Sequence, residues 1–469
     1  MKKLVLSLAL LSLTFASQAR AQWSSDPMVN FGIAVKFDEQ VQPKVRPTSD
    51  GGCYVSWFDN DPIGNPPFGY DVFLQRLDAA GVRQFAPMGI RLADLGMSST
   101  EDYGLDVDAG NNALVAFLDD RRPGGAITVT ATRVSPSGQQ LWGKKGQQVG
   151  RGPDFLGNPK IAATSDGYAV VGWIDNNDLK FQKLDRAGNQ IWGEGGIKIT
   201  APTGLSYSLA DLHGSDNGSV IASWVSAAGF SGPKHLITNK IGPDGSLLWG
   251  ANHVTVFDGG SLQFGNFPPF VTDGAGGAVF GWYQVSPLQS LAQHILADGS
   301  EAFPHNGVPG STNTAHDQVN PSVSYDPATG STYLFWDEIL EGPLTNEGIS
   351  CQKFDPTGAV QFGAFGLVVQ PFTSSAVINV TSVFTVAGPL VVWSSEPNYG
   401  QDSIYGAKVD PNANIICPTF YVSSILSSKS RLDTRLSTNG VAFSVWSDAR
   451  TDGGDIYGQD IKADCTLGQ

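Results

Sequence analysis

An aromatic residue inside a short, apolar, β-rich run recurs eight times along this chain, at spacings of 51 to 60 residues. The eight residues are Trp57, Phe117, Trp173, Trp224, Trp282, Trp336, Trp393 and Trp446. A turn rich in Gly and Asp precedes most of them, and before that turn lies a second apolar stretch, often opened by proline, as at Pro43, Pro159, Pro269 and Pro321. Two such runs joined by a tight turn predict a β-hairpin. A fixed period of this length is the signature of a repeat architecture.

The second half of each repeat has its own pattern. A third apolar run reads Gln182-Lys183-Leu184-Asp185 in its clearest copy, and a turn containing glycine follows. An aromatic stands four residues after that glycine in the pairs Gly81/Phe85, Gly138/Trp142, Gly188/Trp192, Gly245/Trp249, Gly299/Phe303 and Gly358/Phe362. A β-branched run, such as Gly196-Ile197-Lys198-Ile199, then supplies a fourth strand. Four antiparallel strands per repeat describe a propeller blade.

We therefore predict an all-β fold, an eight-bladed β-propeller of four-stranded antiparallel blades in a single domain over residues 22–469. One blade cannot bury both of its faces, so neighbouring blades are expected to enclose the repeated aromatics between them. The predicted blades cover about residues 38–95, 96–151, 152–201, 202–257, 258–312, 313–371, 372–424 and 425–469, the last together with 22–37.

The last repeat ends one strand short, and the start of the chain carries a matching segment. Gly32-Ile33-Ala34-Val35 resembles the fourth strands of other repeats, and Met28 falls where those repeats place an aromatic. An open ring would expose an unpaired strand edge, which proteins avoid. We therefore expect the N-terminal strand to complete the last blade and to close the ring.

The N-terminus predicts export. Met1-Lys2-Lys3, an apolar run and Ala19-Arg20-Ala21 form a pattern typical of a signal peptide over residues 1–21. The apolar run is too short to span a bilayer, which takes roughly 20 residues. We expect a secreted protein, periplasmic or extracellular, without membrane insertion and monomeric.

The net charge limits the classes of binding partner, and the cysteines suggest one disulfide. Acidic residues exceed basic ones by 44 to 29, which excludes nucleic acid as a favoured partner, because phosphate binding needs clustered Lys and Arg. Export permits disulfides. Cys417 and Cys465 lie in the last two repeats and are the candidate disulfide, whereas Cys53 and Cys351 fall on strand positions and are expected to be buried thiols.

Two sets of residues are candidates for ligand binding. The position two after the repeated aromatic is acidic at Asp59, Asp119, Asp175 and Asp448, where the second strand enters its loop. These carboxylates could bind a cation or act as a catalytic pair, or each could cap its own loop or pair with a nearby arginine. The neighbouring loops carry Phe68, Tyr70, Phe230 and Tyr399, which suit sugar stacking or protein contacts, or alternatively cover the base of their loops.

Motifs for cofactors and for common nucleophiles are absent from the sequence. The runs Asp59-Asn60-Asp61 and Asp175-Asn176-Asn177-Asp178 resemble fragments of calcium loops without the spacing of an EF-hand. The six histidines show no spacing typical of zinc ligands. We expect no cofactor, and Ca²⁺ at these loops is the one candidate ion. The sequence assigns no catalytic residue.

Short motifs resemble two groups of bacterial propellers. Trp446-Ser447-Asp448-Ala449-Arg450 followed by Asp455-Ile456-Tyr457 resembles the secreted and periplasmic TolB-like repeats. The Gly-x-x-x-Trp spacing at Gly138, Gly188 and Gly245 is similar to the tryptophan-docking repeat of quinoprotein-like propellers, which have eight blades and include the outer-membrane assembly protein BamB. The resemblance implies architecture rather than activity, and the chain lacks the adjacent cysteine pair that many quinoprotein dehydrogenases use.

The repeats are regular, and no single repeat carries a distinct group of polar residues of the kind that forms an active site. This favours a non-enzymatic propeller, a binding or scaffolding module for a glycan or for a secreted or envelope protein. One alternative is a carbohydrate-active enzyme, a glycoside hydrolase or polysaccharide lyase, with carboxylates on the top face of the ring. A second alternative is a structural component of an envelope assembly.

Overall fold

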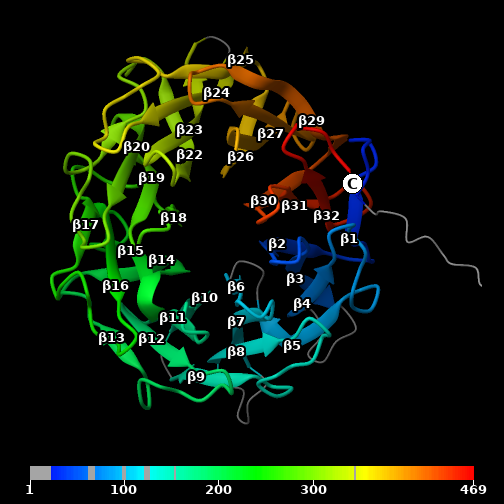
Figure 1. Ribbon diagram of the computed structural model, residues 1–469, viewed down its shortest axis with the longest axis vertical. Coiled ribbons are helices and arrows are strands. Elements are labelled where there is room, and N and C mark those ends of the chain that lie inside the picture. The colour runs from blue at the N-terminus through cyan, green and yellow to red at the C-terminus, as the bar shows by residue number, and fades with distance from the viewer. Residues whose placement is uncertain are drawn as a thin grey trace, which may run out of the picture.

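Eight four-stranded antiparallel sheets form a closed ring in the computed structural model of the protein (Figure 1). The structure describes residues 23–61, 69–97, 102–120, 127–152, 155–342 and 345–468. The predicted signal peptide, residues 1–21, lies outside these residues. The sheets confirm the predicted all-β, eight-bladed propeller. Among the described residues, no helix has the length and apolarity needed to cross a membrane.

The strands of each blade follow one another from the centre of the ring outwards. Blade 1 contains β2 (Gln40–Pro47), β3 (Cys53–Asp61), β4 (Gly69–Leu77) and β5 (Ile90–Met97). Blade 2 contains β6 (Gly104–Val107), β7 (Ala113–Asp119), β8 (Thr128–Val134) and β9 (Gln147–Arg151). Blade 3 contains β10 (Leu156–Ala163), β11 (Ala169–Asp175), β12 (Asp178–Leu184) and β13 (Ile197–Ile199). Blade 4 contains β14 (Ser206–Gly214), β15 (Val220–Ala227), β16 (Lys234–Ile241) and β17 (Val254–Phe257), with the short 3₁₀ segment η1 (Asp216–Gly218) in its first turn.

The second half of the ring repeats this order. Blade 5 contains β18 (Phe270–Thr272), β19 (Ala278–Val285), β20 (Leu288–Ile295) and β21 (Val308–Pro309). Blade 6 contains β22 (Asp317–Asp326), β23 (Ser331–Leu340), β24 (Asn346–Phe354) and β25 (Leu367–Thr373). Blade 7 contains β26 (Ala376–Thr385), β27 (Gly388–Glu396), β28 (Asp402–Val409) and β29 (Ile415–Ser427). Blade 8 contains β30 (Lys429–Leu436), β31 (Ala442–Asp448), β32 (Asp455–Ile461) and, from the other end of the chain, β1 (Phe31–Ala34).

The repeated aromatics lie between blades, as the sequence predicts. All eight are at most 1% exposed. Trp173 of blade 3, for example, shares an apolar cluster with Leu118 and Val149 of blade 2. Burying rings of this size between every pair of neighbouring sheets supplies a large part of the hydrophobic stabilisation of the ring.

In blades 1 to 5, aromatics of the second set pack on a glycine turn of the next blade. Trp142, Trp249 and Phe303 pack against Gly188, Gly299 and Gly358, where a Cβ atom would come within 2.7 to 3.0 Å of the ring. These glycines also have φ near +88°, a conformation that side chains rarely adopt. The turn therefore requires glycine twice over, for its backbone and for the close approach of the aromatic.

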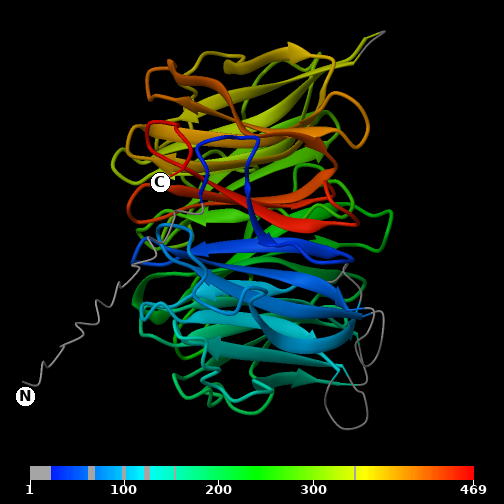
Figure 2. The same cartoon turned by 90° about the vertical axis from the view of Figure 1, so that its right-hand side faces the viewer.

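The N-terminal strand closes the ring. β1 pairs antiparallel with β32, with Phe31 opposite Gly458, and Figure 2 shows the blue N-terminal segment beside the red C-terminal strands. The expectation that Met28 takes the place of the docking aromatic is wrong, because Met28 is 63% exposed. Trp23 takes that place: it packs on Phe31 and Phe443 and stands against the turn glycine Gly81.

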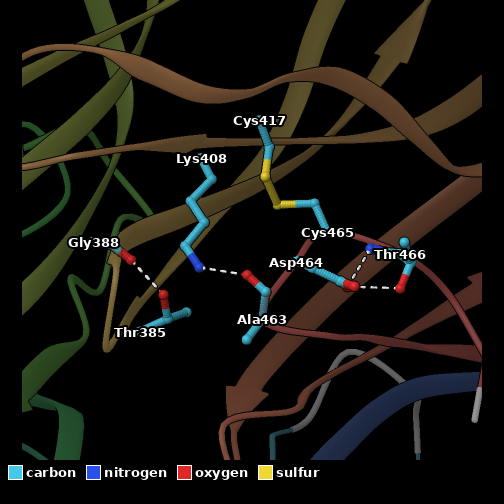
Figure 3. Close-up of a disulfide and its surroundings, with 8 residues drawn as sticks. All are labelled: Thr385, Gly388, Lys408, Cys417, Ala463, Asp464, Cys465 and Thr466. Carbon is cyan, nitrogen blue, oxygen red and sulfur yellow. Dashed lines mark hydrogen bonds between the residues drawn. A yellow bond between two sulfur atoms is a disulfide. The ribbon is translucent and has the colours of Figure 1, made fainter.

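A disulfide joins the last two blades. Cys417 in β29 is bonded to Cys465 in the turn after β32, which is the pairing that the sequence offered (Figure 3). Beside it, the Lys408 ammonium donates a hydrogen bond to the Ala463 carbonyl at 2.8 Å. Cys53 and Cys351 are buried free thiols. A disulfide of this kind fits a protein that is located outside the cytoplasm.

A candidate active site in the central channel

The innermost strands carry an irregularity that recurs around the ring. At the same point of five inner strands the ladder is broken by a β-bulge. The bulged residues have left-handed φ values, namely Gln42 (53°), Asn158 (45°), Asn320 (50°), Asn379 (55°) and Arg431 (56°). Non-glycine residues pay for this conformation, and bulges commonly re-aim side chains at functional sites. All five residues line cavities in or beside the central channel.

The first cavity, of about 580 Å³, is bounded by inner strands of blades 1, 3, 4 and 8, by the start of blade 2, and by the loop 258–269 between β17 and β18. Its volume lies within the range of small-molecule sites. Five cationic side chains line it: Lys44, Arg46, Lys160, Arg431 and Arg435. Two carboxylates, Asp102 and Asp433, line it as well.

Each of these carboxylates serves two cations. Asp102 pairs with Lys44, at 2.7 Å between Nζ and Oδ1, and with Lys160. Asp433 pairs with Arg46 at 3.3 Å and with Arg435 at 3.0 Å. Burial by itself would raise the pKa of Asp102, but the ammonium groups of Lys160 and Lys44 hold it well below its usual range. Asp102 therefore stays ionised at neutral pH.

Carboxylates also satisfy the exposed edges of the inner strands. The unpaired backbone N–H of Val45 donates to Asp433 Oδ2 at 2.9 Å, and that of Phe270 donates to Asp211 Oδ2 at 3.2 Å. Asp211 also lies 2.9 Å from Nε2 of His213. These contacts cross from one blade to the next, so they give the channel wall a fixed polar lining.

A second cavity, of about 420 Å³, adjoins the first, since Gly265 and Pro269 line both. Its wall includes Phe264, Tyr283, Asn320 and Asn379. Phe264 lies beside Phe230, with ring centroids 4.4 Å apart, and the two rings are 59% and 75% exposed. The Lys234 ammonium lies 5.5 Å from the centre of the Phe264 ring. One exposed aromatic ring, Phe264, thus lines a cavity whose wall carries amide side chains, and a second ring, Phe230, packs beside it.

A group of carboxyls lies behind this second cavity, in blade 6. Asp337 is 2% exposed, and burial, together with the nearby Glu347, raises its pKa to about 8. Asn320, on the cavity wall, follows Val319, which pairs with Asp337 across the β22–β23 ladder. Burial also raises the pKa of Glu347, which lines a smaller cavity of about 140 Å³. Asp337 therefore carries a proton near neutral pH, unlike an ordinary carboxyl group.

The acidic residues expected from the sequence lie at the ends of second strands, away from both cavities. Asp59 pairs with Lys36 at 2.9 Å and Asp175 with Lys180 at 2.5 Å. Asp448 is buried and pairs with Arg450 at 2.5 Å, and it also accepts a hydrogen bond from the indole of Trp446. Asp119 is fully buried. Ligand binding by these four residues stays a prediction.

The expected loop aromatics are placed differently from one another. Phe230 joins the exposed aromatic pair described above. Tyr70 is half-buried and its hydroxyl donates to Glu39, while Tyr399 is 98% exposed. Phe68 lies outside the described residues. Ligand binding by these aromatics also stays a prediction.

Sequence reasoning missed the residues of the inner strands. Lys44, Arg46, Lys160 and Arg431 belong to no recognisable motif. One sequence pattern does indicate part of the site: an amide residue directly before an inner-strand proline, as in Gln42-Pro43, Asn158-Pro159 and Asn320-Pro321. Among the described residues, no group of three or more His, Cys, Asp or Glu side chains is placed to hold a metal ion. A Ca²⁺ site at the acidic loops stays a prediction.

No family model and no curated protein matches the chain. Solved structures do resemble it. A puromycin hydrolase variant shares 12% identity at a TM-score of 0.44, with 88% of this chain and 59% of that chain covered. An ulvan lyase of a new polysaccharide lyase family shares 11% identity at a TM-score of 0.45, covering 83% and 96%. The β-propeller domain of the trilobed protease from Pyrococcus furiosus shares 8% identity at a TM-score of 0.42, covering 83% and 98%.

These comparisons contradict the expectation of a non-enzymatic binding or scaffolding module, because the similar structures include a hydrolase, an arabinanase and polysaccharide lyases. At such low identity the likeness shows the propeller fold and nothing finer. The similarity to TolB-like and quinoprotein-like repeats stays a prediction. An activity for this chain has to be argued from its own site.

Proposed function

We propose that the protein is a carbohydrate-active enzyme that acts outside the cytoplasm and binds a glycan across the two adjoining cavities of the channel. One observation carries the proposal. Inner-strand bulges present the amides of Asn320 and Asn379 to the cavity that the exposed ring of Phe264 lines, and Phe230 packs beside that ring. Sugar rings offer hydroxyls on their edges and C–H groups on their faces, and this site offers complementary groups to both.

Each part of the site has a matching role. The amides of Asn158, Asn320 and Asn379 can both donate and accept hydrogen bonds, as a sugar hydroxyl does. The Phe230–Phe264 pair provides an apolar platform against which the face of a sugar ring can lie. Since the bulges are built into the strands, these groups are held in place before the substrate arrives, which lowers the entropic cost of binding.

Asp337 is the candidate proton donor. Cleavage of a glycosidic bond by hydrolysis needs a carboxyl group that is still protonated at working pH. The pKa of Asp337, raised to about 8 by burial and by Glu347, meets that requirement. Asp337 itself lines neither cavity; Val319, its partner across the β22–β23 ladder, precedes Asn320 of the cavity wall.

The test is to incubate residues 22–469 with a panel of neutral and acidic polysaccharides and to measure new reducing ends. Ultraviolet absorbance of an unsaturated product separates elimination from hydrolysis. Phe264→Ala should raise KM by roughly tenfold, because a stacked ring contributes about 1 kcal/mol or more. Phe365→Ala is the matched control, since this ring is 64% exposed in the turn between β24 and β25 and lines neither cavity.

Asp337→Asn separates proton donation from binding. The substitution keeps the shape of the side chain but removes the acidic proton, so kcat should fall at least a hundredfold while KM changes little. If no polysaccharide in the panel is cleaved, the proposed function is wrong. If cleavage persists unchanged in the Asp337 variant, the protein is still an enzyme, but Asp337 is not its proton donor.

A further inference from the structure

The charge of the channel cavity is opposite to that of the protein. The chain has a formal net charge of −15. The larger cavity nevertheless has five cations and two carboxylates on its wall, an excess of three positive charges. Two more carboxylates, Asp106 and Asp211, stand near this cluster but do not line the cavity, and each accepts a backbone N–H of the next blade.

The ion pairs do not use up this positive charge. Asp102 is shared by two ammonium groups and Asp433 by two guanidinium groups. Asp106 and Asp211 offset the other two charges, since Asp211 interacts with Lys160 and both carboxylates interact with Arg46. The one charge left over is that of Arg431. Its side chain makes no ion pair or hydrogen bond within the described part of the chain, and the residue is exposed to the channel.

The backbone of Arg431 shows that its position is not a by-product of packing. It has φ +56° at the bulge, where blades 3, 6 and 7 have asparagine. Asparagine is among the residues that enter the left-handed region most readily, whereas an arginine gains nothing locally from it. The ring could be built with asparagine at this point, as three other blades are, so the arginine is best explained by what it presents to the cavity.

We propose that the channel cavity selects an acidic glycan, and that Arg431 binds the anionic group of one sugar, a uronate carboxylate or a sulfate ester. This inference rests on the proposed function and names the substrate class of that site. A guanidinium forms paired hydrogen bonds with either group, and such charge-assisted bonds are stronger than neutral ones. The positive side chains on the cavity wall attract further acidic sugars of the same polymer to the channel.

The experiment compares matched substrates that differ only in charge. Polygalacturonate is set against its methyl ester, and a sulfated galactan against the same polymer after desulfation. Binding is measured by titration calorimetry and cleavage by new reducing ends, at low and at high salt. We expect one acidic polymer to bind at least tenfold more tightly than its neutral partner, with the difference shrinking in salt because exposed charges are screened.

The matched variant is Arg431→Asn. It installs the residue that blades 3, 6 and 7 already hold in the same backbone conformation, so the bulge and the fold should be kept. Affinity for the acidic polymer should fall about tenfold to a hundredfold, as for the loss of a hydrogen bond to a charged group. Lys144→Asn, in the exposed turn between β8 and β9, removes the same charge elsewhere and should change nothing.

The outcomes separate the two proposals. Loss of acidic preference in Arg431→Asn alone supports the inference, and the preferred pair tells whether carboxylate or sulfate is the group bound. If the wild type cleaves neutral polymers as well as acidic ones and Arg431→Asn is unaffected, the inference is overturned while the enzyme stands. If the wild type neither binds nor cleaves any of the polymers, the proposed function fails and the inference fails with it.

Discussion

Trp23 offers the most direct test of how the ring is held shut. It is 3% exposed and packs on Phe31 at 5.5 Å and on Phe443 at 5.6 Å between ring centroids. A buried indole removes about 200 Å² of surface from water, which at about 25 cal/mol per Å² amounts to about 5 kcal/mol. Trp23→Ala also leaves a cavity at a joint where β1 pairs with β32 over a short stretch, so we expect a loss of about 4 kcal/mol.

The assay is urea unfolding of residues 22–469, followed by intrinsic fluorescence and by circular dichroism. Met28→Ala is the control, because the 63% exposed Met28 should contribute less than about 0.5 kcal/mol. If Trp23→Ala and Met28→Ala shift the unfolding midpoint equally, the N-terminal aromatic does not hold the ring, and the closure would have to rest on the β1–β32 hydrogen bonds alone.

Three further predictions concern stability. Replacing Cys417 and Cys465 by alanine should cost about 4 kcal/mol, from the chain entropy of a cross-link over 48 residues, and a reducing agent should then no longer alter the unfolding midpoint, as it does in the wild type. Asp102→Ala should cost about 2 kcal/mol at pH 7, because it leaves two lysine ammonium groups unpaired. Since the pKa of Asp102 is depressed in the folded protein, the stability that this carboxylate adds is present above about pH 4 and is lost in acid. The variant and the wild type should therefore become equally stable in acid. The raised pKa of Asp337, about 8, has the opposite sign: its contribution is fully present below about pH 4 and is lost as the pH rises to 8. Asp337→Asn should therefore gain stability relative to the wild type between about pH 4 and pH 8 and gain no more above it, and parallel pH profiles would contradict this assignment.

The architecture was open to prediction because it rests on repeated, local signals. The aromatic of each second strand and the glycine turns recur with a period that only a ring of similar sheets satisfies. The misplacement of the docking aromatic at Met28 has a simple reason. The last blade is assembled from both ends of the chain, so its spacing between Trp23 and β1 need not follow that of an uninterrupted repeat.

The candidate site was far less visible. Arg431 and Lys44 become neighbours of the same cavity only when blade 8 closes against blade 1, and no spacing along the chain records that contact. Asp337 is likewise one acidic residue among 44 in sequence, and only its burial beside Glu347 raises its pKa. The acidic positions after the repeated aromatics did stand out in the sequence, because they recur in four of the eight repeats.

The pairing of β1 with β32 has a consequence for the time course of folding. Phe31 meets Gly458 only after nearly the whole chain has been made, so this contact closes a very long loop and carries a correspondingly large entropic cost. Blades 1 to 7 are each continuous in sequence and can form in order as the polypeptide emerges. Until the last strands arrive, β1 has no sheet to join and Trp23 lacks its contact with Phe443. The chain therefore passes through an open arc whose first and last blades each expose one face.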